Sequence, residues 1–415
     1  MSTSVSHPDV LVVGGGPGGC AAGYWLARKG VSALVVEKKT YPREKTCGDG
    51  LTPRAIKQLL DMDFDFSVPQ IHRIKGLRAY AGDLMLEMPW PERTSYPNWG
   101  ASIRRSDLDG AVAHLAEKQG AEVRQATEAI AVVEDKRLVG VDLKSADGSI
   151  ERVFPRVVVI ADGSLSRFGR ALSTERRKDY PFALAVRTYY ESPNSADEYI
   201  ESQLDIRDVR GRSLPSYGWV FPLGDGTINV GVGALSTFKG WKDVNTSHML
   251  EAYVAGLPDH WKVSGVDALQ PATGGKLPMA MSVGPKVGAN WLVIGDAAGA
   301  INPFNGEGID YAYETGRLAA DVIVEALAAD DLALLSRYAQ VLEDEYAAYH
   351  KVARLFVKII GNPSVMRGLT QVGLRSRPLM EWTLKVMANL LEPEEYGMTE
   401  RVYKAIEKVV RIVPG

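Results

Sequence analysis

The sequence predicts an α/β fold that combines a discontinuous Rossmann-type domain, an inserted antiparallel β-sheet domain and a helical C-terminal region. Three observations lead to this class. A glycine-rich turn joins a buried strand to a helix near the N-terminus, short buried strands recur far apart along the chain, and helical periodicity fills almost everything after residue 308. At 415 residues the chain exceeds the size at which one hydrophobic core usually keeps growing, so more than one domain is expected.

Composition excludes several classes of protein. Apolar residues make up 46% and charged residues 24%, which are ordinary values for a globular chain. The net charge of −3 lacks the basic excess of nucleic-acid-binding proteins, so no nucleic-acid partner is expected. Two cysteines cannot form a disulfide framework, and the six histidines show no metal-ligand spacing, so no metal site is expected. Because the sequence has no long apolar run and no signal or transit pattern, we expect a cytoplasmic protein.

The first 40 residues predict a strand, a turn, a helix and a second strand. Residues 9–13 are almost continuously apolar, as in a central strand of a parallel sheet that is covered on both faces. Small residues predict a helix from about Cys20 to Lys29, with Gly30 placed to end it. Residues 33–36 predict another buried strand, so the order of elements is that of a Rossmann unit.

A glycine pattern fills the turn between that first strand and the helix. Gly14, Gly16 and Gly19 form G-x-G-x-x-G. Such glycines permit a tight turn and let the backbone approach a pyrophosphate, while the helix N-terminus supplies N–H groups to the phosphates. Glu37, at the end of the second strand, stands where an acid accepts a hydrogen bond from a ribose hydroxyl. Together these residues predict that the chain binds a dinucleotide.

Buried strands of this type are spread along the chain, with different material between them. They lie at residues 9–13, 33–36, 156–160 and 291–294. The intervening segments alternate in short β-strands, which indicates a second, sheet-rich domain inserted twice. We expect the dinucleotide-binding domain to comprise residues 1–71, 101–175 and 276–335, the substrate domain residues 72–100 and 176–275, and the C-terminal helical region residues 336–415.

Two acidic residues directly follow two of these strands. Asp162 comes after the strand at 156–160, in Ala-Asp-Gly, and Asp296 comes after the strand at 291–294, in Gly-Asp-Ala-Ala. Because the carboxyl ends of parallel strands share one edge of a sheet, both side chains can reach a ligand bound at that edge. Each acid taken alone also fits an ordinary turn.

The order of these motifs resembles that of the p-hydroxybenzoate-hydroxylase-like flavoproteins. In those proteins a glycine fingerprint is followed by an Asp-Gly and then a Gly-Asp motif, which Asp162 and Asp296 match. The resemblance implies that FAD is the cofactor and that Asp296 holds one of its ribityl hydroxyls. It also implies that Arg105, at a helix start in R-S-D-L-D, approaches the flavin chain.

The segment NPFNGEGIDYA resembles the loop of the same superfamily that faces the flavin ring. The resemblance implies that Gly306, Gly308 and Ile309 turn backbone N–H groups toward the N1/O2 edge of the flavin. A helix that starts there would stabilise the negative charge of a reduced flavin, because the N-terminal end of a helix is the positive end of its dipole.

Two further motifs narrow the resemblance to the geranylgeranyl reductase family. Residues 42–48 are similar to its P-x-x-K-x-C-G motif, and residues 217–222 to its Y-x-W-x-F-P motif, which lines the isoprenoid pocket. Within the family, the residues in and around these motifs are most similar to those of actinobacterial members that act on menaquinone. The resemblance covers about residues 8–330 and implies an FAD-dependent reductase that saturates a C=C bond of an isoprenoid chain. The implied substrate is one isoprene unit of the menaquinone side chain, and the implied reaction is hydride transfer from reduced flavin plus protonation.

Five residues of these two motifs are candidate site residues whose roles stay open. Cys47 is either a small packing residue or a polarisable group beside the flavin, and Lys45 is either a solvated charge or a contact to phosphate or flavin. With Gly48 they form a candidate cofactor-binding loop. Tyr217 and Trp219 alternate along an expected strand and form either a sheet core or an aromatic wall for a prenyl chain. Cys47, Tyr217 and Trp219 are the catalytic candidates, and the proton donor stays open between Cys47, Tyr217 and solvent.

Other functions stay open on the same fold. One is reduction of geranylgeranyl diphosphate or another prenyl lipid, a second is O₂-dependent monooxygenation or halogenation, and a third is a prenyl-lipid carrier without catalysis. The sequence contains no second G-x-G-x-x-G and so no separate NAD(P)H domain. The electron donor, NAD(P)H or another reductant, is therefore expected to bind only transiently.

A basic segment stands near the C-terminus. Residues 351–390 carry a single acidic residue, Glu381, among many apolar ones. Their seven basic residues are Lys351, Arg354, Lys358, Arg367, Arg375, Arg377 and Lys385. Basic helices with apolar faces either lie on the anionic cytoplasmic face of a membrane or close the pocket of a lipid substrate, and both fit an isoprenoid partner.

Overall fold

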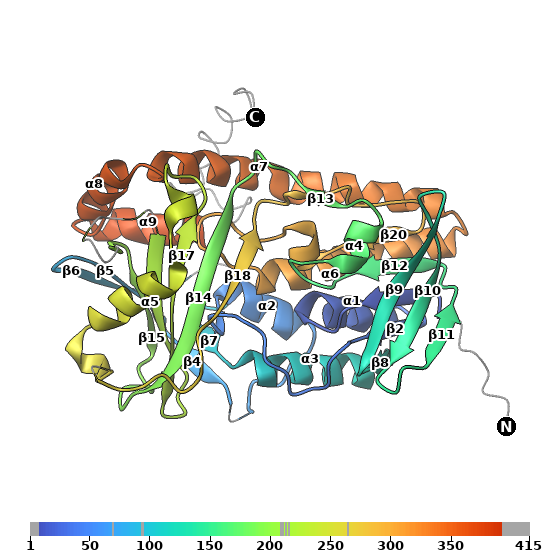
Figure 1. Cartoon of the computed structure of the whole chain (residues 1–415), viewed down its shortest axis with the longest axis horizontal. Helices are drawn as coiled ribbons and strands as arrows, with labels where there is room; N and C mark the ends of the chain where they lie inside the picture. Colours follow the sequence, from blue (N-terminus) through green and yellow to red (C-terminus); the bar gives the residue numbers. More distant parts are fainter. Residues whose placement is uncertain are drawn as a thin grey trace.

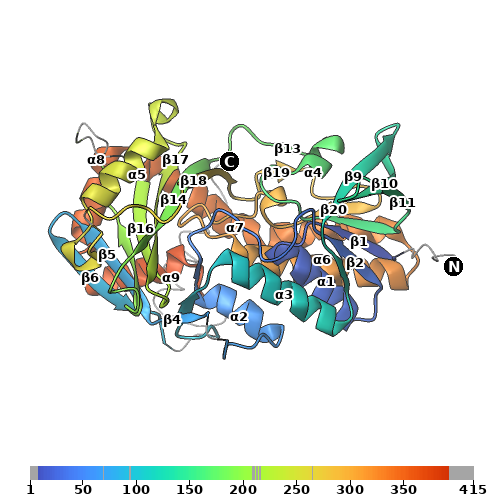
Figure 2. The ribbon, with the colours of Figure 1, turned by 60° about the horizontal axis from the view of Figure 1, so that its bottom comes forward.

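The computed structural model describes residues 8–68, 70–92, 95–207, 211, 214, 216–263 and 265–391. Figure 1 shows two halves along the long axis of the molecule, with a parallel sheet at the end that holds the N-terminus and a large antiparallel sheet at the other end. The turned view in Figure 2 keeps these two sheets at opposite ends, with helices between and around them. This arrangement confirms the predicted α/β fold class, including its helical C-terminal region.

The parallel sheet has the strand order β20-β12-β1-β2-β8, and every neighbouring pair in it is parallel. Its members are β1 (Val10–Val13), β2 (Ala33–Val36), β8 (Glu122–Arg124), β12 (Val157–Ile160) and β20 (Trp291–Val293). The four predicted strands are therefore confirmed in one sheet, and β8 is an additional member. Every residue of β1, β2 and β12 is buried, as expected for strands covered on both faces.

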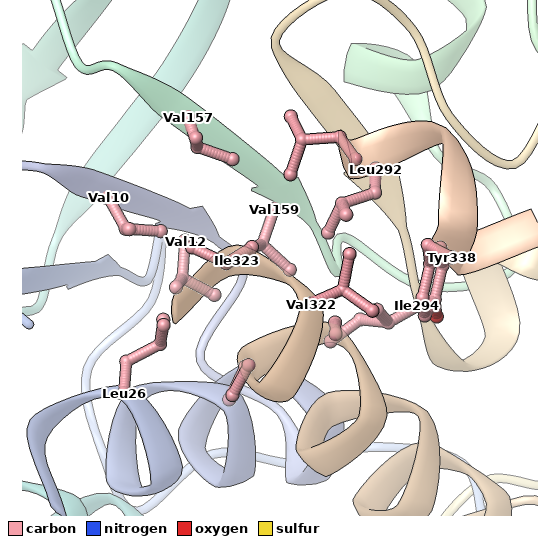
Figure 3. Close-up of a cluster of buried hydrophobic side chains, with 14 of the residues drawn as sticks. Val10, Val12, Leu26, Val157, Val159, Leu292, Ile294, Val322, Ile323 and Tyr338 are labelled. Atoms are coloured by element: carbon pink, nitrogen blue, oxygen red, sulfur yellow. The ribbon is translucent and has the colours of Figure 1, made fainter. Parts of the chain in front are cut away.

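Two helices cover one face of this sheet. These are α1 (Pro17–Arg28) and α6 (Ile309–Ala328), and Figure 3 shows side chains of both buried against β1, β12 and β20. Helix α1 begins before the predicted start at Cys20, because proline at a first helical position lacks only an N–H that would have no helical partner. Gly30 follows its last turn in the left-handed conformation, as predicted.

An antiparallel meander and a short helix cover the other face. The meander consists of β9 (Thr127–Glu134), β10 (Arg137–Ser145) and β11 (Ile150–Val153), and the helix is α4 (Arg167–Ala171). Their buried apolar side chains pack with those of the parallel sheet in one cluster.

The second large sheet has seven strands in the order β18-β14-β17-β16-β15-β5-β6. Their bounds are β5 (Gly76–Ala81), β6 (Leu84–Pro89), β14 (Phe182–Glu191), β15 (Tyr199–Gln203), β16 (Ser216–Pro222), β17 (Thr227–Leu235) and β18 (Thr273–Pro278). Strands from both inserted segments thus join one sheet. The proposed domain boundaries themselves stay a prediction.

The prediction of short strands throughout 176–275 is wrong at α5 (Thr246–Ala255). The Asn245 side chain accepts from the backbone N–H groups of Ser247 and His248 and so caps this helix. Met249 and Tyr253 are buried against the seven-stranded sheet. Local capping and an apolar face therefore outweigh the strand pattern of the surrounding sequence.

Further strands and helices complete the fold up to α3 and between the two large sheets in sequence. They are β3 (Gly50–Leu51), β4 (His72–Ile74), β7 (Gly100–Ser102), β13 (Glu175–Arg176), β19 (Val283–Gly284), α2 (Pro53–Asp61) and α3 (Arg105–Gln119). Helices α2 and α3 share a buried cluster with α1.

Up to residue 391, where the described part of the chain ends, three α-helices follow α6, namely α7 (Arg337–Ile360), α8 (Pro363–Gly373) and α9 (Arg377–Met387). Helix α9 packs against β5 and β6 through Met380 and Leu384. The last part of the predicted helical region, residues 392–415, lies outside the described residues. In the part of the chain that the structure describes, no helix has the length and apolar character that crossing a membrane requires.

The contact between α1 and α6 leaves no space for a side chain at Gly316. A Cβ there would lie 2.7 Å from the Gly18 carbonyl oxygen and 3.1 Å from the Ala22 backbone nitrogen. Gly316→Ala is expected to lower the free energy of unfolding by about 1–3 kcal/mol, because the helices must move apart. Urea unfolding followed by tryptophan fluorescence measures the change.

Gly368→Ala on α8 is the matched control, since a Cβ at Gly368 meets nothing within 4 Å. It should leave stability unchanged or raise it by up to about 1 kcal/mol, the helix preference of alanine over glycine. Equal stability of both variants and the parent chain would contradict the close packing of α1 on α6.

Candidate active site

The glycine turn before α1 has the geometry of a phosphate-binding turn. Gly14 has φ +107°, and a Cβ at Gly19 would lie 1.8 Å from the Gly14 carbonyl oxygen, so both positions require glycine. Gly16 is the N-cap residue of α1, and among the described residues no side chain caps this helix end. The first N–H groups of α1 therefore have no capping side chain and can bind an anion.

Glu37 lies beside this turn. Its two carboxylate oxygens accept from the backbone N–H groups of Gly15 and Lys39, at 3.0 Å each. Arg43 Nη2 lies 3.4 Å from Glu37 and 3.0 Å from Asp109. The structure thus brings the predicted ribose-binding acid to the predicted pyrophosphate turn.

Asp162 and Lys45 lie at the same edge of the parallel sheet. Asp162 Oδ2 accepts from the Phe168 backbone N–H at 3.1 Å, whereas its Oδ1 is buried and has no hydrogen-bond partner within the described part of the chain. Lys45 Nζ lies 3.8 Å from the Cβ position of Gly163. A buried carboxylate oxygen without a partner is the kind of atom that a hydroxyl group of a ligand satisfies.

The residues predicted to hold the flavin end of the cofactor meet at the N-terminus of α6. Asp296 stands in a short 3₁₀ turn, Gly295–Ala298, and its Oδ1 lies 3.2 Å from the Cβ position of Gly308. Gly308 is the N-cap residue of α6, which begins at Ile309 and has no side-chain cap in the part of the chain that the structure describes. Gly306, in the preceding turn, has φ +77°.

Three aromatic residues of β16 face this region. The ring centroids of Tyr217 and Trp219 are 5.8 Å apart and those of Trp219 and Phe221 are 6.2 Å apart, so the rings form a row along one side of the strand. The Tyr217 hydroxyl donates to the Asn305 carbonyl oxygen, next to Gly306. A Cβ at Gly48 would lie 2.9 Å from the Phe221 ring. The aromatic row therefore contacts both glycine-containing loops of the candidate site.

The loop that carries Cys47 and Gly48 depends on a residue that the sequence analysis missed. Asp49 is fully buried, with φ +65°. Its Oδ2 accepts from Tyr189 Oη at 2.5 Å and from Asn229 Nδ2 at 2.8 Å, and its Oδ1 accepts from the Arg105 backbone N–H at 3.2 Å. Burial raises the pKa of Asp49, although the hydrogen bonds from Tyr189 and Asn229 favour its charged form. This carboxyl group joins the loop to α3 and to the seven-stranded sheet.

Two more residues hold the backbone of the loop. Asn229 Nδ2 donates to the Cys47 carbonyl oxygen at 2.9 Å, and Arg187 Nε donates to the same oxygen at 3.1 Å. Trp219 Nε1 donates to Asn229 Oδ1 at 3.0 Å, and its ring is buried over Gly231. Trp219 therefore also fixes the amide that holds Cys47.

The charges near Cys47 are balanced within the protein. Arg105 makes a two-bond ion pair with Asp109, at 2.6 and 2.8 Å. Burial alone would lower the pKa of Arg105, but the carboxylate of Asp109 outweighs it and raises that pKa. Burial raises the pKa of the Cys47 thiol, and the nearby Arg105 guanidinium offsets this only in part. Cys47 and Cys20 are both free thiols.

A second residue that the sequence analysis missed is Glu307, between Gly306 and Gly308. Its Oε1 accepts from the Thr52 hydroxyl, and its Oε2 lies 3.3 Å from Asn305 Nδ2. Burial raises the pKa of Glu307 to about 7, against the effect of these hydrogen bonds. The only sequence signal was its position in the GEG segment, which the glycines alone had explained.

Comparison with known proteins gives the family. The FAD binding domain family matches residues 7–342. The chain belongs to this family. It is 37% identical to a menaquinone reductase of Mycobacterium tuberculosis (strain H37Rv), over 98% of this chain and 97% of that protein. It is 30% identical to digeranylgeranylglycerophospholipid reductase 1 of Methanopyrus kandleri, over 83% of this chain and 88% of that protein.

This member of the FAD-binding family is therefore an FAD-dependent oxidoreductase, as the resemblance implied. Its fold is also similar to that of solved flavoproteins. A geranylgeranyl bacteriochlorophyll reductase-like protein of Thermoplasma acidophilum has a TM-score of 0.78 at 22% identity, over 96% of this chain and 99% of that chain. A flavin-dependent brominase has a TM-score of 0.72 at 20% identity, over 98% and 100% of the two chains. These two likenesses concern the fold alone.

The Asn229 amide is expected to be the side chain on which the loop most depends. Asn229→Ala leaves the Trp219 N–H without a partner, and also removes donors to Cys47 and Asp49. We expect the free energy of unfolding to fall by about 2–3 kcal/mol, because buried polar groups without partners are costly. Urea unfolding of the flavin-free protein measures this loss.

Gln340→Ala is the control, because Gln340 is an exposed amide with one hydrogen bond, to Asp344 at 2.7 Å. Its effect should stay within about 0.5 kcal/mol, as for most surface substitutions. A similar small effect for Asn229→Ala would show that the loop does not depend on this amide.

Proposed function

We propose that this flavoprotein saturates a C=C bond in the isoprenoid side chain of menaquinone. The observation that carries the proposal is the row of aromatic rings on β16, which lies against both the Cys47–Gly48 loop and the turn that starts α6. A row of aromatic side chains suits a prenyl chain, which has apolar surface and no group that forms hydrogen bonds. The identity to menaquinone reductases over almost the whole chain supports this substrate over other prenyl lipids.

We assign the residues around the parallel sheet to FAD. The glycine turn would take the pyrophosphate and Glu37 the adenosine ribose, while Asp162 and Lys45 lie beside the same sheet edge. Asp296 would hold a ribityl hydroxyl. The remaining assigned residues are Gly14, Gly16, Gly19, Cys47, Gly48, Arg105, Gly306, Gly308 and Ile309. The partnerless Asp162 oxygen and the two helix ends without side-chain caps fit such a ligand.

An isolated alkene has no polarising group, so the protein must contribute alignment and exclusion of water. When bound, reduced FAD supplies the hydride. Tyr217 and Phe221 are half-buried and would line the prenyl chain, whereas Trp219 mainly positions the Cys47 loop. A two-electron donor, NAD(P)H or another reductant, must reduce the flavin first.

Anaerobic turnover tests this function. The FAD-loaded protein, reduced chemically, is mixed in detergent with menaquinone in one reaction and with geranylgeranyl diphosphate in another, and products are analysed by mass spectrometry. We expect a gain of two hydrogens on menaquinone alone. A gain of two hydrogens on the diphosphate alone would indicate a general prenyl reductase in place of a menaquinone reductase. No gain on either, with flavin that reoxidises only in air, would favour an oxygenase and contradict the proposal.

We also propose that α8 lies on the membrane that holds the substrate. Val365, Leu369 and Val372 recur on one side of this helix, yet their exposed fractions are 37%, 50% and 62%. Exposed basic residues, Lys358 and Arg375, flank α8 at its two ends. An apolar stripe with basic flanks fits the surface of an anionic membrane.

Helix α9 connects this surface to the candidate site. The Met387 carbonyl oxygen accepts from Asn302 Nδ2 at 2.9 Å, in the loop that precedes α6. Val386 and Trp382 pack around Phe304 of the same loop. A prenyl chain that leaves the membrane at α8 would therefore meet apolar side chains next to the site.

The double substitution Leu369→Glu and Val372→Glu is expected to weaken binding to phosphatidylglycerol-containing vesicles at least ~10-fold, because it removes apolar burial and adds negative charge. Co-sedimentation measures the bound fraction. Ile150→Glu is the control, since Ile150 is 61% exposed on β11, in the half with the parallel sheet. Equal binding by the double variant and the parent chain would contradict this role of α8.

A further inference from the structure

Saturation of a C=C bond needs a proton as well as a hydride, and two predicted donors are poor acids in this structure. The Tyr217 hydroxyl already donates to the Asn305 carbonyl oxygen, and burial raises its pKa further from the neutral range. Burial also raises the pKa of Cys47. A group that gives up a proton near neutral pH serves the reaction better, because the best general acid has a pKa near the working pH.

Glu307 occupies the turn between the two glycines assigned to the flavin. It is half-buried, and its carboxyl group lies between Thr52, from the segment after the Cys47 loop, and Asn305. Asn305 links Glu307 to Tyr217, because its carbonyl oxygen accepts from the Tyr217 hydroxyl and its Nδ2 lies 3.3 Å from Glu307 Oε2. Glu307 is therefore next to both the aromatic row and the start of α6.

The charged and titratable groups that interact electrostatically with Glu307 come from three elements: Arg54 from α2, Asp310 from α6 and Tyr217 from β16. Arg54 would favour a charged Glu307, but it is paired with Glu314 at 2.8 Å. Asp310 is fully buried, and both of its carboxyl oxygens lack hydrogen-bond partners within the described residues. Burial and the charges of Glu307 and Glu314 raise the pKa of Asp310, and Arg54 Nε, 3.9 Å from its Oδ2, opposes this rise.

Burial raises the pKa of Glu307 to about 7, so this carboxyl group holds its proton in a large fraction of molecules at neutral pH. A purely structural carboxylate in an ion pair would instead be charged. The hydroxyl of Thr52 and the amide of Asn305 hold its orientation in either state, because a hydroxyl can donate or accept.

We propose that Glu307 is the acid that protonates the isoprenoid carbon during saturation of the C=C bond. This inference rests on the proposed function. The π bond breaks, one carbon receives a hydride from reduced FAD, and the other receives the proton of the Glu307 carboxyl group. The flavin is thereby oxidised by two electrons, and the carboxylate that remains takes a new proton from solvent.

Glu307→Gln tests the role of Glu307 in turnover, because glutamine keeps the size of the side chain but has no acidic carboxyl proton. We expect FAD to bind within about twofold of the parent affinity, while the single-turnover rate with menaquinone falls at least ~100-fold, as for loss of a general acid. Glu307→Asp should recover part of the rate. Glu343→Gln, at an exposed position on α7, should react like the parent chain.

The pH dependence gives a second readout. The rate of the parent protein should be constant at low pH and fall about tenfold per pH unit above pH 7, since only the protonated carboxyl group can act. The rate of Glu307→Gln should not show this fall. A parent-like rate and pH profile for Glu307→Gln would overturn the proposal, and so would a slow variant that has also lost FAD.

A third readout needs neither flavin nor substrate. Infrared difference spectra of the flavin-free protein should show a carboxyl group that titrates near pH 7 and is absent in Glu307→Gln. Absence of this titration in the parent protein would overturn the assignment of Glu307. If the titration is present but the parent chain reduces no prenyl substrate, the proposed function is refuted. The assignment of a pKa near 7 to the Glu307 carboxyl group would then still stand.

Discussion

The buried carboxyl group of Asp49 is the interaction on which the site depends. Its partners come from β14, β17 and the first residue of α3, so one side chain joins the seven-stranded sheet to the half that contains the parallel sheet. A buried carboxylate costs several kcal/mol unless hydrogen bonds compensate it. The loop that carries Cys47 therefore cannot move away from the aromatic row without exposing or unpairing this group.

Local patterns were enough to predict four of the five strands of the parallel sheet, all but β8. A strand buried on both faces is a short apolar run, and the glycine turn has its own spacing, so both are visible within a few residues. The partners of Asp49 are 56, 140 and 180 residues away, and no local pattern marks them. Helix α5 was missed because its capping residue, Asn245, stands in a segment otherwise rich in short strands.

Two features depend on the environment rather than on the sequence pattern. The apolar stripe of α8 has the spacing of a helix that packs inward, yet the structure leaves Leu369 and Val372 exposed. Glu307 resembles a solvated turn residue, but burial raises its pKa, and a hydrogen bond from Thr52, 255 residues earlier, opposes this rise only in part. Only the fold shows which side of a helix is left exposed and which acid is shielded from water.

The turn before α6 has to meet two electrostatic requirements of the proposed reaction, a negatively charged reduced flavin and a protonated Glu307. The helix dipole stabilises negative charge at its N-terminus, which favours a reduced flavin and also opposes a neutral Glu307. Under the proposed mechanism, burial must therefore outweigh the helix dipole to keep Glu307 protonated. The same dipole stabilises the carboxylate that remains after Glu307 has given up its proton.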